Sequence, residues 1–274
     1  MGSCSSTTSA SEDGYSVTFP AFSFNSGHYR NAYLGRFNPP HGPAKAVVKI
    51  AKRQKLAELV KKKNKTSRSS SNPGSSPGKP ASSKVVASGN LPPTPSSNHS
   101  SLNALASSIA KRILSLPPSA SIASALSDLP AMDVATNMMF EDVLISTLAS
   151  LVSKEFNKRP DGSSPTVKRP LHFAVPRLVT VPRPNFLLSA PPFCPATIEP
   201  YIEGEYHRFV SNNGTLLYNG TVGAFCHYSY HASAGNLLVM DIQGVRTETM
   251  YDLTDPACHS AGGGGLFGEV RRDR

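Results

Sequence analysis

The sequence predicts an α+β fold, with short strands toward both ends of the chain and one long helix between them. Residues 46–50 (AVVKI) form a β-branched run of strand length, and residues 237–240 (LLVM) form an apolar run too short for a helix. Between them, residues 133–157 carry large apolar side chains at helical spacing. The members of that stripe are Phe140, Leu144, Leu148, Leu151, Val152 and Phe156.

Composition limits the class of protein. With 274 residues, 39% of them apolar, 17% charged and 24 of them proline, the chain has room for one large or two small domains and for unstructured segments. A net charge of +10 favours acidic partners such as nucleotide phosphates, nucleic acid or anionic lipid. Its four cysteines are far apart and lack CxxC spacing, and no apolar run approaches the roughly 20 residues of a membrane span. We therefore expect a cytoplasmic protein.

The N-terminus has two interpretations. Residues 1–20 are predicted to be a disordered tail, which is the common state of such Ser-rich starts. The opening MGSCSS also fits an N-myristoylation pattern at Gly2, with Cys4 as a palmitoylation site. The second interpretation implies peripheral membrane contact through the N-terminus.

The segment between the first strands and the long helix is predicted to be mostly non-globular. Residues 52–68 are strongly basic, which suits a solvated helix face, nuclear import, RNA contact or contact with an anionic membrane. Residues 66–101 contain almost no large apolar residue and are predicted to be a disordered insert. Residues 102–116 are predicted to form a helix that docks on the rest of the domain or on a partner, ordinary packing being the favoured alternative.

After the long helix, residues 171–181 are predicted to be an edge strand interrupted by Pro176.

Oxygen ligands gather after the strand at residues 237–240. Asp241 and Gln243 follow it directly, and Asp255 comes later in the same stretch. Carboxylate and amide oxygens suit Mg²⁺, which phosphoryl transfer uses to hold nucleotide phosphates. Lys49 stands inside the early strand, where a lysine either extends to water or reaches such phosphates.

Three motifs carry a family resemblance. They are LLVMDIQGV with LTDPACHS at residues 237–260, FNSGHYRNAY at residues 24–33, and IEPYIEGEY at residues 198–206. Together they resemble the alpha-kinases, atypical protein kinases that include the myosin heavy chain kinases and elongation factor two kinase. The resemblance covers roughly residues 22–60 and 131–260, and the helix at 102–116 matches nothing in it. It implies a two-lobed protein-kinase-like fold, with an N-lobe over residues 21–199 and an incomplete C-lobe over residues 200–274.

The resemblance also assigns roles to residues. Lys49, with Arg30 beside it, would hold the ATP phosphates, and Glu199 would hold the adenine edge. Asp241 would position the acceptor hydroxyl, while Gln243 and Asp255 would bind Mg²⁺. The roles of Asp241 and Asp255 are open to exchange, so both are treated as catalytic.

The chain departs from the family pattern in two places. His227 matches one ligand of the family's structural Zn²⁺, but the run that supplies the other three ligands is absent, so we expect the zinc to be lost. The spacing from Asp241 to Asp255 is fourteen residues where the family has ten, and the extra residues fall at about 246–250. The resemblance therefore implies an alpha-kinase C-lobe that is truncated at its C-terminal end.

Two functions follow from these observations. The first is an ATP-dependent serine/threonine protein kinase of alpha-kinase type, acting on a protein substrate. The alternative is a truncated, catalytically weak relative that serves as a nucleotide-binding or protein-interaction module. A nucleic-acid binder ranks last, because the basic run lacks interleaved aromatic residues, and no nucleic-acid partner is expected.

Overall fold

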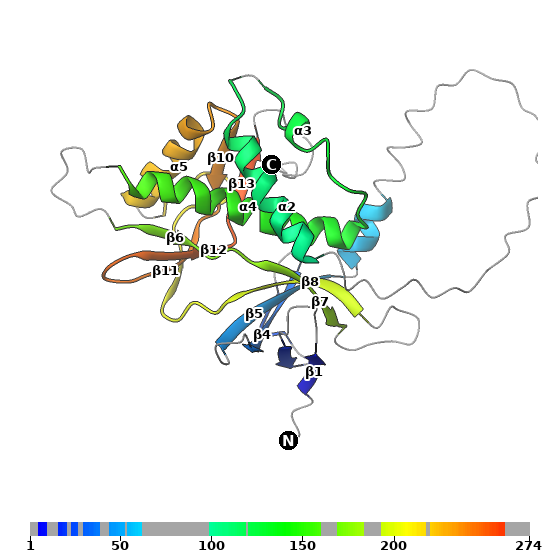
Figure 1. Ribbon diagram of the computed structural model, residues 1–274. Helices are drawn as coiled ribbons and strands as arrows, with labels where there is room; N and C mark the ends of the chain where they lie inside the picture. The colour runs from blue at the N-terminus through cyan, green and yellow to red at the C-terminus, as the bar shows by residue number, and fades with distance from the viewer. Residues whose placement is uncertain are drawn as a thin grey trace, which may run out of the picture.

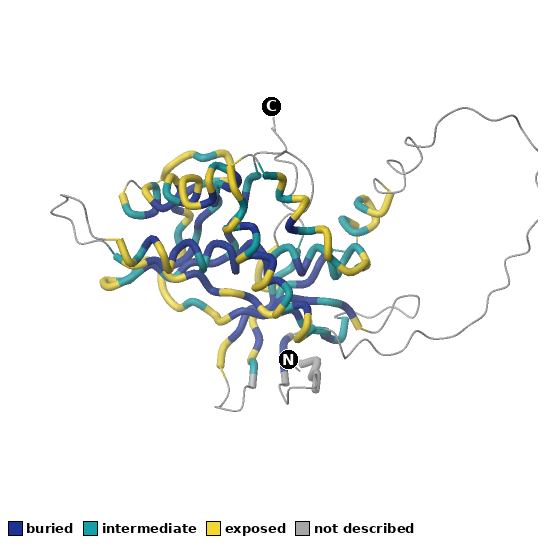
Figure 2. Tube along the Cα trace, turned by 45° about the horizontal axis from the view of Figure 1, so that its top comes forward, coloured by how far each residue is buried: buried dark blue, intermediate teal, exposed yellow. Residues whose placement is uncertain are grey.

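The structure is a computed structural model, and it confirms the α+β fold (Figure 1). It describes residues 5–9, 16–20, 23–26, 30–38, 44–52, 54–61, 99–118, 120–159, 169–183, 193–217 and 220–260. Strands form two groups, and helix α4 (Val134–Asn157) contacts strands of both. In Figure 1, α4 runs across the middle of the molecule with strands below it, and Figure 2 shows the buried residues gathered through that region.

The first sheet is antiparallel throughout. Its strands are β1 (Ser5–Ser9), β2 (Ser16–Pro20), β3 (Asn25–Ser26), β4 (Arg30–Asn38), β5 (Ala44–Ala51), β7 (Arg177–Pro182) and β8 (Phe193–Pro200). They follow the order β1-β2-β4-β5-β8-β7, with β3 paired to β4. A small apolar core lies on one face, built mainly from alternate residues of β5 and β8 such as Val48, Ile50, Ala196 and Ile198.

The disordered-tail prediction is wrong over two stretches. Residues 5–9 and 16–20 pair with each other as β1 and β2, although the prediction placed all of residues 1–20 in a tail. Val17 and Phe19 alternate with polar residues, are almost fully buried, and Phe19 packs 5.4 Å from the Tyr33 ring. This period of two favours a strand. Gly2 and Cys4 lie outside the described residues.

Helix α4 is buried as the sequence predicts, and its N-terminus is capped. Asp133 accepts hydrogen bonds from the backbone N–H groups of Ala135 and Thr136 at 2.9 and 3.0 Å. The central apolar residues Phe140, Leu144 and Leu148 are fully buried. None of the helices among the described residues combines the length and the apolar character needed to cross a bilayer.

Helix α2 (His99–Leu114) packs against α4 in the ordinary way, which was the favoured alternative. Its inward face is made of Leu102, Ala106, Ile109, Ala110 and Ile113. The first turn, residues 99–101, corrects the C-terminal limit predicted for the disordered insert; residues 62–98 lie outside the described residues. Helix α3 (Ile122–Ala125) follows, and Arg112 bonds to the Ala125 carbonyl at 2.9 Å. The described start of the basic run is helical over residues 54–61.

The remaining strands form the second group. It comprises β6 (Leu171–Phe173), β9 (Tyr206–Arg208), β10 (Leu237–Met240), β11 (Gln243–Arg246), β12 (Tyr251–Thr254) and β13 (Ala257–Ser260). Four of them form a sheet in the order β6-β12-β11-β9, and β10 pairs with β13. Helix α5 (Thr221–Ala232) packs on β10.

The predicted edge strand over residues 171–181 is in fact two strands in different sheets. β6 pairs with β12, whereas β7 is an edge of the first sheet. Residues 174–176 lie between them, and Pro176 cannot donate a ladder hydrogen bond, so the pairing changes partner there.

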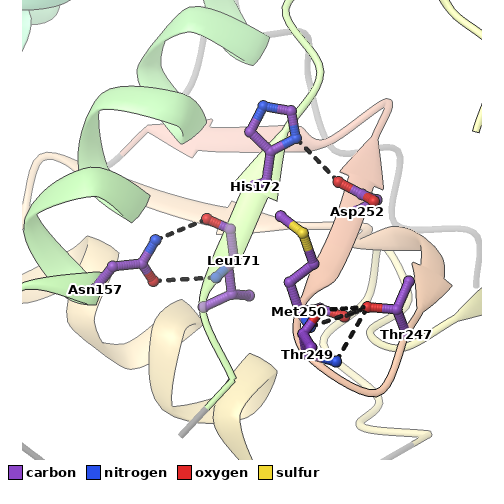
Figure 3. A network of polar contacts seen from close by, with 7 residues as sticks. All are labelled: Asn157, Leu171, His172, Thr247, Thr249, Met250 and Asp252. Carbon is purple, nitrogen blue, oxygen red and sulfur yellow. Dashed lines mark hydrogen bonds and ion pairs between the residues drawn. The ribbon is translucent and has the colours of Figure 1, made fainter.

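Two asparagines hold these two strands on the helices. The Asn157 amide, at the end of α4, donates to the Leu171 carbonyl at 2.9 Å and accepts from the Leu171 N–H at 3.0 Å (Figure 3). Asn103 of α2 makes the same pair of bonds to Leu178 of β7, at 3.3 and 2.9 Å. Each side chain therefore replaces a neighbouring strand as the backbone partner.

Candidate active site

Strand register places three charged side chains on one face of the first sheet. Arg30 of β4 pairs with Ala51 of β5, and Val47 of β5 pairs with Glu199 of β8. Directly paired residues share a face, and so do residues two apart in a strand. Lys49 lies between Val47 and Ala51, so its side chain shares a face with Arg30 and Glu199.

These three residues meet carboxylates from two other elements. Lys49 Nζ lies 2.8 Å from Glu199 Oε1 and 3.4 Å from Asp255 Oδ1, and Arg30 lies 3.3 Å from the same Asp255 oxygen. Arg30 also forms an ion pair with Asp142 of α4. The structure thus brings predicted residues of the first sheet against the loop that follows β12.

The second carboxylate, Asp241, lies across an interrupted hairpin from Asp255. β10 pairs with β13 up to Met240 and Ala257, and β11 pairs with β12 from Gln243 and Thr254. The two ladders have one continuous register, broken where residues 241–242 and 255–256 face each other. Asp241 and Asp255 both have positive φ, 49° and 53°. Such backbone is uncommon for residues other than glycine and is concentrated at functional sites.

The extra residues between these aspartates lie at the far end of the same hairpin. Residues 247–250 form its turn, in which Thr247 Oγ1 donates to the Met250 carbonyl at 3.0 Å and accepts from the Met250 N–H at 3.0 Å (Figure 3). Because the register is continuous from this turn back to the break, the longer spacing leaves Asp255 opposite the Asp241 segment.

Charge compensation fixes the protonation of the cluster. Burial opposes the charged form of Asp255, but Lys49 and Arg30 outweigh it and lower the pKa of Asp255 to about 2. Burial likewise opposes the ammonium of Lys49, but Asp255 and Glu199 raise its pKa. Asp142 differs, because burial outweighs Arg30 and raises its pKa to about 6.

Asp241 retains free acceptor capacity. Arg208 Nε lies 3.2 Å from Asp241 Oδ1, but this buried oxygen accepts no hydrogen bond from any described residue. Burial, opposed by Arg208, raises the pKa of Asp241.

Gln243 begins β11 beside Asp241 and pairs with Thr254, the residue before Asp255. Two carboxylates and an amide, one carboxylate with an unbonded oxygen, fit the oxygen ligand set of Mg²⁺.

His227 has no such setting. It is exposed on α5, and no group of three His, Cys, Asp or Glu side chains suited to a metal occurs among the residues that the structure describes. The zinc-ligand role for His227 therefore gains no support from its surroundings.

Sequence reasoning missed three residues of the site. Asp142 of α4 forms an ion pair with Arg30, and Arg208 forms one with Asp241. The Thr254 hydroxyl donates a hydrogen bond to Glu199 Oε2 at 2.9 Å. As a result, Lys49 and Thr254 occupy the two oxygens of the Glu199 carboxylate. Its role at the adenine edge stays a prediction.

Sequence comparison identifies the family. The family model for the alpha-kinase family matches residues 109–270, more than half of the chain. This match begins inside α2 and includes residues 109–130, which the motif resemblance left out.

The chain is 34% identical over 127 residues to Alpha-protein kinase vwkA and 34% identical over 132 residues to Myosin heavy chain kinase C, both of Dictyostelium discoideum. These stretches cover 44% and 47% of this chain but 19% and 15% of the relatives. The chain thus spans less than a fifth of their length.

Solved structures share the fold. The alpha-kinase domain of myosin-II heavy chain kinase A in complex with adenosine superposes with a TM-score of 0.51 at 18% identity, covering 93% of this chain and 78% of that domain. An inactive form of the same domain complexed with ATP gives a TM-score of 0.51 at 17% identity, covering 93% and 79%. At this identity the likeness concerns the fold, which is the two-lobed kinase-like fold that the motifs predict. With the family match over residues 109–270, the chain belongs to the alpha-kinase family.

Proposed function

We propose that this chain binds ATP and transfers its γ-phosphoryl group to serine or threonine of a protein substrate. One observation carries the proposal: two partly buried cations of the first sheet, Lys49 and Arg30, meet the carboxylate of Asp255, which stands across the interrupted hairpin from Asp241. Cations for phosphates on one side and carboxylates for metal and acceptor on the other are the parts that phosphoryl transfer requires.

Lys49 and Arg30 would neutralise the phosphate oxygens. In the structure both share the Asp255 oxygen, at 3.4 and 3.3 Å, so nucleotide binding exchanges a carboxylate partner for phosphate. Glu199 holds Lys49 in place from the adjacent strand. This contact orients the ammonium before the ligand arrives, which reduces the reorganisation needed during transfer.

Asp241 would position the acceptor hydroxyl. Its Oδ1 accepts no hydrogen bond within the described part of the chain, and its positive φ fixes it at the end of a buried strand. A carboxylate with an open acceptor oxygen is suited to orient a hydroxyl group. Gln243 and Asp255 would hold Mg²⁺, which supplies charge stabilisation on the phosphates when bound.

The position of the adenine base and the class of acceptor are proposed in outline only. Adenine would lie against the backbone around Glu199, where β8 ends at Pro200. The curated relatives include kinases named for the myosin heavy chain, so a protein acceptor is proposed here without a choice of sequence. We also propose a cytoplasmic location and lipid-mediated membrane contact through Gly2 and Cys4. The mass of the N-terminal peptide tests whether a lipid is attached.

A second candidate is a nucleotide-binding module with weak transfer. It is favoured by the ion pairs of the cluster: Arg30 and Lys49 are already neutralised by carboxylates, which phosphate must displace. These carboxylates belong to Asp142, Glu199 and Asp255. Calorimetric titration of ATP with Mg²⁺ into the full chain tests the binding step common to both candidates. We expect saturable binding that Lys49→Met removes. Absence of binding in the unmodified chain would reject both.

A further inference from the structure

The strand that carries Glu199 also carries a buried hydroxyl with no hydrogen-bond partner in the described part of the chain. Thr197 of β8 pairs directly with Lys49 of β5, so its side chain shares the face of Lys49 and Glu199. It is 1% exposed, and its Oγ1 has no hydrogen-bond partner among the described residues. The neighbours Ala196 and Ile198 point to the opposite face, into the small apolar core.

The surrounding polar groups are already paired with one another. Glu199 receives Lys49 at 2.8 Å and Thr254 at 2.9 Å, which uses one bond on each carboxylate oxygen. A buried hydroxyl without a hydrogen bond disfavours folding, and valine has the same shape without that penalty. A threonine at this position is therefore better explained by a ligand than by packing.

The proposed function suggests which ligand atom this is. Thr197 lies two residues before Glu199, about 7 Å along the strand, and the adenine is expected at that end of β8. Its short side chain keeps the hydroxyl close to the sheet, whereas the Lys49 ammonium extends to Asp255. The phosphates therefore belong with Lys49, and we place the base next to Thr197.

We propose that the Thr197 hydroxyl hydrogen-bonds the 6-substituent of the purine and so makes Thr197 a residue that contacts the base. This inference rests on the proposed nucleotide binding. A hydroxyl both donates and accepts, so it can pair with the 6-amino group of adenine or the 6-oxo group of guanine. Purine riboside triphosphate has only hydrogen at this position and cannot make the bond.

The experiment compares ATP with purine riboside triphosphate, by calorimetric titration, on four full-length chains. These are the unmodified chain, Thr197→Val, Thr197→Ser, and Thr147→Val as the matched control. Thr147 is also buried, but its hydroxyl donates to the Val143 carbonyl at 2.6 Å, within its own helix.

We expect Thr197→Val to weaken ATP binding about threefold to tenfold, the usual range for one lost hydrogen bond, and to leave purine riboside triphosphate unchanged. Thr197→Ser and Thr147→Val should bind ATP like the unmodified chain. The melting temperature of Thr197→Val should stay the same or rise, because the hydroxyl has no partner to lose among the described residues.

Three results would overturn the inference. In the first, Thr197→Val binds ATP like the unmodified chain; in the second, it loses affinity equally for both nucleotides, which would indicate packing. In the third, its melting temperature falls, which would show that the hydroxyl has a structural partner. Failure of the unmodified chain to bind either nucleotide would instead reject the proposed function and this inference with it.

Discussion

Lys49 and Glu199 form a diagonal ion pair across adjacent strands, with their charged atoms 2.8 Å apart and their side chains 12% and 6% exposed. A buried pair of this kind contributes little against an apolar replacement, but either member alone is an uncompensated charge. Lys49, the proposed phosphate-binding residue, therefore also contributes to the stability of the fold through this pair.

The first prediction concerns this dependence. Lys49→Met should lower the free energy of unfolding by about 3–5 kcal/mol, because Glu199 then remains buried without its cation. Denaturant unfolding measures the loss. The double variant Lys49→Met with Glu199→Gln removes both charges and should recover most of the stability while still failing to bind ATP. A double variant no more stable than Lys49→Met would show that the pair is not the cause.

The second prediction concerns pH. Burial, together with the neighbouring Asp142, raises the pKa of Glu141 from 4.5 to about 8, although Arg30 opposes the shift. The folded protein thus holds this proton more tightly than the unfolded chain, so the free energy of unfolding falls as pH rises from about 4.5 to about 8.

Glu141→Gln removes this titration. The variant should match the unmodified chain near pH 5 and be more stable at pH 9, by at least about 1 kcal/mol or roughly 2–4 °C in melting temperature. Melting curves over pH 5–9 provide the measurement. Equal pH slopes for the two proteins would exclude Glu141 as the titrating group.

The third prediction concerns the hairpin that carries the carboxylates. Gly244 has φ of 147°, and a Cβ there would lie 2.1 Å from the Asp252 carbonyl oxygen. Gly244→Ala should cost more than the roughly 1–3 kcal/mol of backbone strain alone, because backbone must move as well. Gly220→Ala is the matched control, since Gly220 also has positive φ but no described atom within 4 Å of the added Cβ. Equal losses of stability would show that the close approach at Gly244 has no effect.

The fourth prediction separates structure from function at the asparagines that hold the two edge strands. Asn157→Ala leaves the Leu171 N–H and carbonyl without these bonds and should cost about 1–3 kcal/mol of stability. Asn103→Ala should cost a similar amount at β7. Because neither side chain belongs to the charged cluster, ATP affinity should be unchanged in both variants at a temperature where they are folded. A selective loss of ATP binding in either one would place that asparagine in the site.

The residues that sequence reasoning located are those with an unusual local setting. Lys49 is a charge inside a β-branched strand, and Asp241 and Asp255 stand next to apolar runs, so each was visible before any fold was known. The family motifs supplied their relation to one another, because contacts between distant strands have no local signature. The register that puts Arg30 and Glu199 on the Lys49 face needs the sheet itself.

Asp142 illustrates why the rest was missed. It stands next to Glu141 on α4, two residues from the apolar stripe, where an acid is usually solvated. The available signal was that Val143 and Ile145 are apolar as well, so the apolar surface of the helix extends beyond the stripe toward this pair of acids. The change of sheet at Pro176 and the pairing of residues 5–9 with 16–20 depend on partners far away in the chain, which local pattern does not specify.

The most direct test of the account is transfer of radiolabelled γ-phosphate from ATP by the full chain to a panel of acceptor proteins, with Asp241→Ala as its matched partner. One Asp241 oxygen accepts no hydrogen bond from any described residue, and its ion-pair partner is Arg208 rather than Lys49, so the variant should fold and bind ATP. The account predicts transfer to serine or threonine by the unmodified chain and a loss of at least about 100-fold in Asp241→Ala. Equal transfer by the two proteins, or label on neither, would contradict it.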